Sequence, residues 1–293
     1  MQRPVHNIYE LSPNELRSLQ LYLLDMLIEL DRICRKNGIR YYIDGGTLLG
    51  AVRHGGFIPW DDDLDIGVTR MEYERLRKAC ETDLDESKYF FQDHTTDPYY
   101  RWGYGRLRLK NSEFVRIGQE HMKMKTGVFL DIFPRDNVPD SKICYLVHSF
   151  YCYMLRKTLY AEAGKVTGKN SFIRGWYRLL YMIPSTFTFR RLEKLAERYN
   201  RKETKRMRAL AFPMLLKGQY GYKREWYEDV SEVEFEGHSF MCPRDYDGYL
   251  TELYGDYMIP PPPEKRHWHP VSRFRLPEER TSDSDCSKSG GLN

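Results

Sequence analysis

Two aspartates that lie two positions apart carry the clearest chemical signal in this chain. Asp63 and Asp65 flank Leu64 within the run 59–67. Alternate residues of a β-strand project to the same side, so both carboxylates face one way and Leu64 faces the core. Adjacent carboxylates repel each other unless a cation lies between them. Because Mg²⁺ is often held by one or two carboxylates together with substrate phosphates, the pair predicts metal-dependent chemistry on a phosphorylated ligand.

A glycine-rich turn lies shortly before this pair. Gly45, Gly46 and Thr47 follow a predicted strand at 39–43 and precede a short predicted helix at 47–53. Glycines let backbone N–H groups approach a ligand, and a helix N-terminus attracts phosphate. The alternative is a tight turn in which Thr47 caps the helix. The nearby aspartate pair favours phosphate binding.

The longer run from Tyr42 to Ile66 contains both features and resembles the LicD family. That family has the polymerase-β-like nucleotidyltransferase fold, comprises bacterial phosphocholine transferases of cell-surface glycans, and is related to animal fukutin-type proteins. The resemblance continues at 129–134, returns at 254–258, 261–262 and 266–267, and spans residues 15–269.

The resemblance implies a third acidic residue on a neighbouring strand. Asp131 fits, because it is the only charge in the apolar run 127–133. A lone carboxylate there is unfavourable unless it is metal-bound or hydrogen-bonded. A buried aspartate that caps a turn near Pro134 is the alternative. Asp63, Asp65 and Asp131 are thus the expected catalytic residues and the ligands of one or two Mg²⁺ (or Mn²⁺) ions, which polarise the phosphoryl group.

A further carboxylate is expected to accept the proton of an attacking hydroxyl. Asp131 could serve, and so could Asp61, if the strand extends far enough to place it beside Asp63. Asp62 is expected to be a solvated loop residue.

Basic side chains should neutralise the remaining charge of the phosphates. Arg53 and His54 lie just past the short helix, and Arg106 and Arg108 share one face of a predicted strand. Two guanidiniums on one face could bind a pyrophosphate, although a solvated sheet face is the alternative.

A second basic group follows a proline-rich stretch near the C-terminus. The family parallel implies that Arg266 and His267 contact substrate. His267 and His269 could instead be zinc ligands, but no other ligand cluster accompanies them.

The elements that position these residues indicate an α/β (α+β) fold: a nucleotidyltransferase-like mixed sheet flanked by helices, with a mainly helical insert and a C-terminal return to the core. We expect a catalytic core at 1–140, a basic helical segment at 141–210, a part completing the site at 211–276 and a disordered tail at 277–293. Further strands are predicted at 64–68, 88–92, 104–109, 113–117, 127–133 and 233–240, and further helices at 13–37, 69–80, 143–159, 171–182, 190–208 and 246–254.

Composition is typical of a globular protein in a reducing compartment. The 293 residues include six scattered cysteines without metal-ligand spacing, and we expect neither a signal peptide nor a spanning helix. The net charge is +4, but residues 142–208 hold 16 Lys/Arg against 4 Asp/Glu. The apolar helices of this segment are either core helices or rest on an anionic membrane surface.

Together these features predict a cytoplasmic phosphotransferase, peripheral at the inner face of the membrane. The resemblance implies transfer of an alcohol phosphate from a CDP-alcohol, with CDP-choline preferred, to a glycan hydroxyl, with release of CMP. Glycerol, ribitol and ethanolamine phosphates remain open. The alternatives are a true nucleotidyltransferase and a non-catalytic glycan- or lipid-binding protein. Nucleic acid is not an expected partner, because no groove-reading motif is present.

Overall fold

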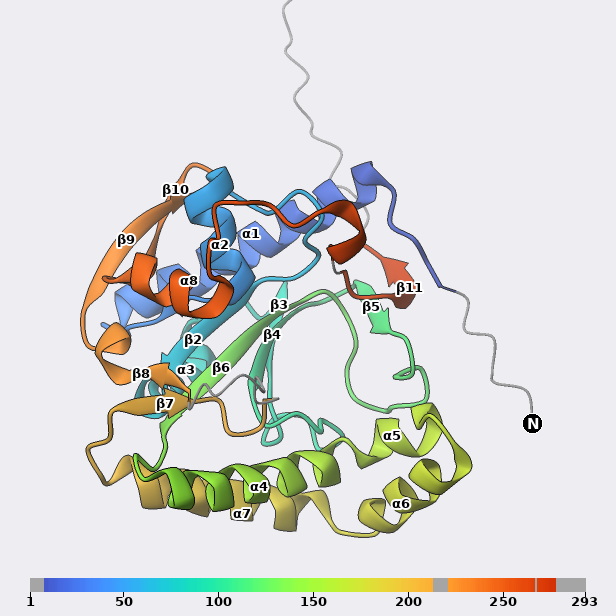
Figure 1. The fold of residues 1–293 in the computed structure, drawn as a ribbon. Coiled ribbons are helices and arrows are strands. Elements are labelled where there is room, and N and C mark those ends of the chain that lie inside the picture. Colours follow the sequence, from blue (N-terminus) through green and yellow to red (C-terminus); the bar gives the residue numbers. More distant parts are fainter. Residues whose placement is uncertain (1–7, 213–220, 267, 278–293) are drawn as a thin grey trace, which may run out of the picture.

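A twisted mixed sheet forms the centre of the molecule (Figure 1). The computed structural model describes residues 8–212, 221–266 and 268–277. Within them the main path of the sheet runs in the order β1-β2-β6-β4-β3. The strands are β1 (Tyr42–Ile43), β2 (Asp65–Thr69), β3 (Tyr89–Gln92), β4 (Gly105–Leu109) and β6 (Phe129–Asn137). β2 and β6 are parallel, whereas the β1–β2, β4–β6 and β3–β4 pairs are antiparallel. The predicted mixed sheet is confirmed.

Helix α1 (Pro13–Lys36) packs with α3 (Arg70–Asp83) beside this sheet. Ser12 and Glu15 form a capping box at its N-terminus. Leu19, Leu23, Met26 and other residues of its apolar stripe are buried in the main core. The helix therefore begins where its local signals place it and presents its apolar side to the sheet.

Helix α2 (Gly45–His54) joins the first two strands. It begins two residues earlier than predicted, because Asp44 rather than Thr47 is its N-cap. Gly50 lies so close to the following loop that a Cβ atom would be 2.5 Å from the carbonyl oxygen of Gly56. This close approach holds the loop leading to β2 against α2.

A layer of helices lies apart from the sheet along one side of the molecule (Figure 1). It consists of α4 (Lys142–Leu159), α5 (Ala161–Thr167), α6 (Ser171–Tyr181) and α7 (Ser185–Asn200). α4 packs against α6 and α7, and α5 against α6. None of the helices within the described ranges combines the length and apolar character needed to cross a bilayer.

Two predictions in this region are wrong at their boundaries. The helix predicted at 190–208 begins at Ser185 and ends at Asn200, and Arg206–Arg208 forms strand β7. The strand predicted at 127–133 continues past Pro134 to Asn137. The early end of the helix and the extension of β6 are linked, because Asp136 and Asn137 pair with β7 and this pairing overrides helical periodicity. β7 then pairs with β8 (Tyr222–Lys223).

The C-terminal part returns to the core as the sequence predicts. The hairpin β9 (Val230–Phe235) and β10 (His238–Pro243) packs near β1 and α2, and α8 (Tyr246–Tyr254) also contacts α2. The last strand, β11 (Val271–Arg275), pairs with β5 (Glu113–Arg116). Residues 278–293, which hold nearly all of the predicted tail, lie outside the described ranges.

Candidate active site

The register of two parallel strands places two of the predicted metal ligands side by side. Asp65 of β2 is directly opposite Asp131 of β6. The backbone N–H of Asp131 donates to the carbonyl oxygen of Leu64 over 3.0 Å. Because neighbouring strands are about 4.8 Å apart, this register brings the two carboxylates to one point of the sheet.

Asp131 is also opposite Arg106 of the antiparallel strand β4. Nε of Arg106 donates to Oδ1 of Asp131 over 2.5 Å, and the guanidinium carbon lies 3.8 Å from the ring centre of Phe129. Both charged residues are buried. Arg106 therefore faces the carboxylate, and its predicted contact with a pyrophosphate stays a prediction.

Arg108 points the same way one pleat further along β4. It donates to Oε1 of Gln92 and to the carbonyl oxygen of Gly127, each over 2.6 Å. Burial, together with the Arg106 charge, lowers the pKa of Arg108 to about 9. The alternative of a solvated sheet face is wrong for this arginine pair, because tertiary packing covers both side chains.

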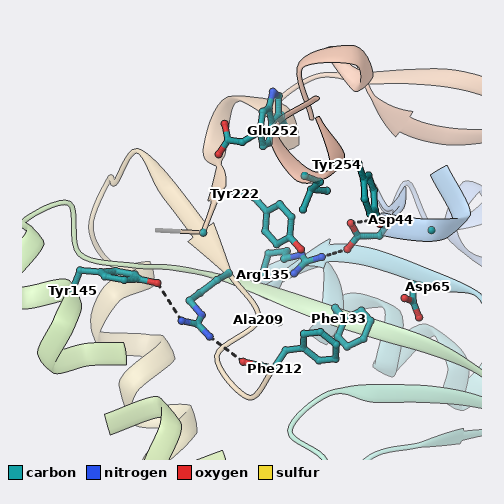
Figure 2. Close-up of a pocket in the computed structure, with 16 residues that line it drawn as sticks. Asp44, Asp65, Phe133, Arg135, Tyr145, Ala209, Phe212, Tyr222, Glu252 and Tyr254 are labelled. Atoms are coloured by element: carbon teal, nitrogen blue, oxygen red, sulfur yellow. Dashed lines mark hydrogen bonds and ion pairs between the residues drawn. The ribbon is translucent and has the colours of Figure 1, made fainter. Parts of the chain in front are cut away.

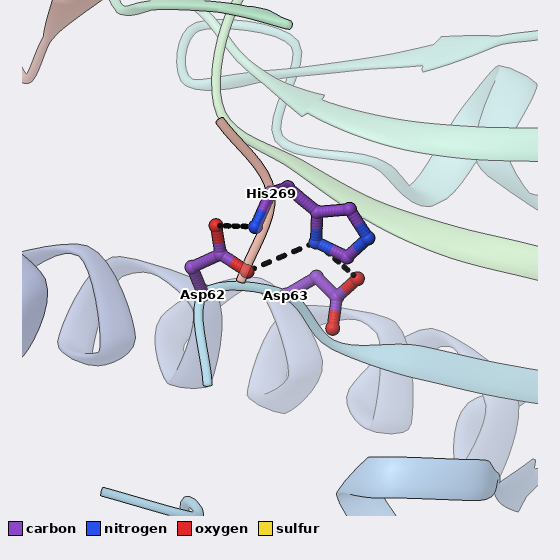
Figure 3. A group of neighbouring side chains, drawn as sticks. All are labelled: Asp62, Asp63 and His269. Atoms are coloured by element: carbon purple, nitrogen blue, oxygen red, sulfur yellow. Dashed lines mark hydrogen bonds and ion pairs between the residues drawn. The ribbon is translucent and has the colours of Figure 1, made fainter. Parts of the chain in front are cut away.

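Asp62 and Asp63 meet a histidine from the far end of the chain (Figure 3). Asp62 accepts from the backbone N–H of His269 over 3.0 Å and lies 2.9 Å from its Nδ1 atom. Oδ2 of Asp63 is 3.3 Å from the same Nδ1 and 3.4 Å from Nη2 of Arg116. The expectation that Asp62 is solvated is wrong, because the returning C-terminal segment buries it. Among the residues described, this trio has its potential ligand atoms within 4.8 Å of one another.

The acidic groups carry more negative charge than their neighbours offset. Burial, then the charges of Asp63 and Asp62, raises the pKa of Asp61 to about 8. Burial, then the charges of Asp63 and Asp131, raises the pKa of Asp65 well above its ordinary range. Burial also raises the pKa of Asp63. Oxygen ligands under such mutual repulsion suit a hard divalent cation, so these residues fit Mg²⁺ or Mn²⁺.

The start of α2 lies directly against this acidic group. A Cβ atom on Gly46 would be 3.1 Å from Oδ2 of Asp61, so glycine leaves room for that carboxylate. Oγ1 of Thr47 accepts from the backbone N–H of Asp65 over 2.9 Å. Thr47 thus ties α2 to β2, and its predicted role in gripping phosphate stays a prediction.

Asp44 is the N-cap of α2 and stabilises its first turn. Its Oδ1 accepts from the N–H of Gly45 over 2.9 Å and from the hydroxyl of Tyr249 in α8. Its Oδ2 pairs with Arg135, a buried residue of β6 that lies 4.2 Å from the ring centre of Tyr222. Figure 2 shows Arg135 reaching Asp44 beneath Tyr222.

A cavity of about 300 Å³ opens beside the glycine turn and Asp65. Two arginines line it, Arg135 and Arg208. Arg208 donates to the hydroxyl of Tyr145 over 3.2 Å and to the carbonyl oxygen of Phe212 over 2.9 Å (Figure 2). The aromatic part of the wall is made of Phe133, Tyr145, Phe212, Tyr222, Trp226 and Tyr254. Carboxylates, guanidinium groups and aromatic rings therefore all line the same cavity.

Sequence reasoning missed the arginines of this cavity. Asp131, Phe133 and Arg135 alternate along β6, and that spacing alone would have placed all three on one side of the strand. Arg208 gave no such signal, because it lies in the segment that was predicted to be helical.

Comparison with known proteins relates part of the chain to one family. The sequence model of the LicD/FKTN/FKRP nucleotidyltransferase domain matches residues 38–154. The chain is 29% identical over 264 residues to the lipopolysaccharide cholinephosphotransferase LicD of Haemophilus influenzae, which covers 87% of this chain and 96% of that protein. The chain therefore contains a LicD-type domain at residues 38–154. This resemblance, predicted from the sequence, is confirmed.

Two other relatives cover smaller parts of this chain. An uncharacterised protein of Rickettsia prowazekii is 54% identical over 176 residues, which is 56% of this chain and 59% of that protein. The human ribitol 5-phosphate transferase FKRP is 38% identical over 71 residues, which is 23% of this chain and 14% of that protein.

The matched LicD domain holds the acidic residues but not the whole cavity. Arg208, Tyr222 and Tyr254 line the cavity from beyond residue 154, and His269 contacts Asp62 from beyond it. The site is therefore completed by segments that follow the matched domain.

The remaining predicted contacts lie away from the cavity. Nη1 of Arg53 donates to the carbonyl oxygen of Tyr257 over 2.9 Å, and His54 adjoins it in the last turn of α2. The guanidinium of Arg266 is 4.1 Å from the ring centre of Trp60. His267 lies outside the described residues. Substrate binding by these residues stays a prediction.

Proposed function

We propose that this protein transfers phosphocholine from CDP-choline to a sugar hydroxyl of a cell-surface glycan or its lipid-linked precursor. The proposal is supported by the LicD-type domain at residues 38–154 and by the similarity to a lipopolysaccharide cholinephosphotransferase along nearly all of that protein. The single observation that carries it is the placement of Asp65, opposite Asp131, on the wall of a cavity that also contains two arginines.

Asp63, Asp65 and Asp131 would hold Mg²⁺ (or Mn²⁺). When bound, the ion polarises the phosphoryl group and stabilises the negative charge of the leaving phosphate. Burial raises the pKa of Asp63 and Asp65, and a bound cation would offset the cost of keeping these two carboxylates charged.

Two arginines of the cavity bind the diphosphate of the donor in this proposal. Arg135 and Arg208 are both buried, and each is already oriented by a protein partner. A fixed guanidinium gives planar, charge-assisted hydrogen bonds to phosphate oxygens at little entropic cost. The rings of Tyr222 and Tyr254 offer faces to the base or to a quaternary ammonium group.

Asp61 is the proposed proton acceptor. Its Oδ2 lies beside Gly46 at the start of α2, next to the acidic group, and there a carboxylate is placed to take the proton of an attacking hydroxyl. The hydroxyl oxygen of the sugar forms a bond to the phosphorus that carries the alcohol. The bond from that phosphorus to the bridging oxygen breaks, CMP leaves with that oxygen, and the hydroxyl proton passes to Asp61.

Mass spectrometry of a reaction with CDP-choline and a glycan extract tests the proposal. We expect CMP and a glycan heavier by phosphocholine, with EDTA abolishing both. Choline phosphate together with a nucleotide-modified glycan would show a nucleotidyltransferase instead. Parallel reactions with CDP-glycerol, CDP-ribitol and CDP-ethanolamine identify the alcohol.

Two variants separate catalysis from binding alone. Asp65→Asn should lose turnover, whereas Asp229→Asn should keep it, because Asp229 is an exposed residue paired with Arg244 at the surface. Equal turnover in both variants would refute the assigned site. No turnover with any CDP-alcohol, combined with retained glycan binding in Asp65→Asn, would favour a non-catalytic binding protein.

The place of the reaction is part of the proposal. We assign it to the cytoplasmic side of the membrane, in agreement with the free thiols of Cys34, Cys80, Cys144, Cys152 and Cys242.

A further inference from the structure

The helical layer exposes large apolar side chains on its outer side. Ile143, Val147 and Phe150 recur at positions i, i+4 and i+7 of α4, so they form one exposed stripe. Phe172, Trp176 and Leu179 repeat the same spacing on α6, and Phe172 is 85% exposed. The turn after α6 adds Met182, which is 77% exposed. We call these residues the outer apolar face.

This face is additional to the side that the same helices bury. Tyr145, Cys152 and Leu155 of α4 belong to the core of the helical layer. Tyr177 and Leu180 of α6 are buried against α5. Each helix therefore has apolar residues toward the protein and a second apolar stripe toward the outside. More than half of the exposed large apolar side chains in the described chain lie within 143–187. Such a concentration marks an interaction surface.

The charges around the outer apolar face are nearly all positive. Residues 142–191 contain nine Lys or Arg residues and one acidic residue, Glu162. Glu162 is neutralised, because its carboxylate lies 3.1 Å from Nε of Arg101. The ammonium of Lys165 lies 3.3 Å from the ring centre of Tyr181, and the guanidinium of Arg191 lies 5.1 Å from that of Phe187. Cations beside exposed rings suit a boundary between apolar and anionic groups.

We propose that the outer apolar face docks the protein on the surface of an anionic phospholipid bilayer. Helices of this kind lie in the plane of the interface, with their apolar stripes among the acyl chains and their Lys and Arg residues at the headgroup phosphates. Charge complementarity selects this occupant, because a second copy of the chain would bring the same basic residues face to face.

Docking of this kind fixes the distance between the cavity and the bilayer surface. Tyr145 lines the cavity from the inner side of α4, and the stripe of Val147 is on the outer side of the same helix. The cavity is thus separated from the bilayer by one helix, which is about 10 Å thick. The proposal does not depend on the reaction, so membrane binding can be tested in protein without substrate.

Vesicle flotation with the full chain tests the docking surface. The vesicles contain either phosphatidylcholine alone or phosphatidylcholine and phosphatidylglycerol at about 7:3. We expect binding only to the anionic vesicles, with release at about 0.5 M NaCl. Phe172→Asp/Met182→Asp should weaken binding at least about 10-fold, because two inserted apolar groups are lost. Arg190→Glu/Arg191→Glu should weaken it at least about 25-fold.

Met71→Asp is the matched control, because Met71 is 64% exposed on α3, outside the helical layer. It should bind vesicles as the unchanged protein does. Circular dichroism checks that every variant is folded. The proposal is overturned by absence of binding to anionic vesicles at low salt, by equal binding to both compositions, or by full binding of Phe172→Asp/Met182→Asp. It is also overturned if lipid-free protein sediments as a dimer that this double variant dissociates.

Discussion

Replacement of Arg106 should lower the stability of the fold, because it leaves the buried carboxylate of Asp131 without its ion-pair partner. In Arg106→Met the side-chain volume is largely kept, but Asp131 loses the guanidinium that lies 2.5 Å from its Oδ1. Asp131 is buried, and Asp65 is its neighbour in the register. Breaking a buried pair from one side costs about 3–5 kcal/mol, because the remaining charge has no partner.

The loss should be large enough to measure by thermal unfolding. At about 2–4 °C per kcal/mol for a chain of 150–250 residues, a loss of about 3–5 kcal/mol should lower the Tm by roughly 6–20 °C in EDTA. The double variant Arg106→Met/Asp131→Leu should recover at least half of the lost stability, because no buried charge remains. Added Mg²⁺ should raise the Tm of Arg106→Met more than that of the unchanged protein if Asp131 is a metal ligand.

An exposed arginine provides the control for this experiment. Arg244 pairs with Asp229, and both side chains are more than two-thirds exposed. Arg244→Met should change the free energy of unfolding by less than about 0.5 kcal/mol. The reasoning is refuted if Arg106→Met lowers the free energy of unfolding by less than about 1 kcal/mol. It is also refuted if the losses measured for Arg106→Met and for Asp131→Leu simply add in the double variant.

Three further outcomes are expected. Asp65→Asn should raise the Tm in EDTA by a few degrees and remove the further rise that Mg²⁺ gives, because burial and neighbouring carboxylates disfavour the charge of Asp65; differential scanning fluorimetry that shows a lower Tm in EDTA would contradict this. Gly50→Ala should lose about 1–3 kcal/mol in urea unfolding, since its Cβ atom would meet the carbonyl oxygen of Gly56 at 2.5 Å, whereas Gly175→Ala, in open space on α6, should gain about 0.5–1 kcal/mol. Burial lowers the pKa of His148 from 6.5 to about 4, so protonation of the unfolded chain should remove up to about 3 kcal/mol as the pH falls from 6.5 to 4. His148→Gln should show a smaller loss over the same pH range, and a parallel decline in both proteins would argue against the assignment.

Elements with strong local signals were predictable from the sequence. The capping box of α1 is formed by residues three positions apart. The turn at Glu236 and Gly237, with φ angles of 53° and 78°, is likewise formed by neighbouring residues. α8 has the bounds that its sequence predicts. Such features depend on neighbours in the chain, so a single sequence contains them.

The contacts that build the site depend on distant pairings. Asp62 is buried by His269, and Arg106 faces Asp131 only because β4 and β6 adopt one register. Strand β7 replaces a predicted helix because β6 extends to meet it. These contacts join residues that are far apart in the chain, so local propensity cannot predict them.

The hydrogen bond between Tyr249 and Asp44 has a consequence for the order in which the protein is made. The two residues are 205 positions apart, yet the tyrosine hydroxyl donates to the aspartate that caps α2. At about 5–20 residues per second, roughly 10–40 s of translation separate them. During most of that interval the nascent chain contains Asp44 but lacks Arg208, Tyr249 and His269. The first turn of α2 therefore has to form before its partner Tyr249 has been synthesised. Completion of the centre is thereby linked to completion of the chain.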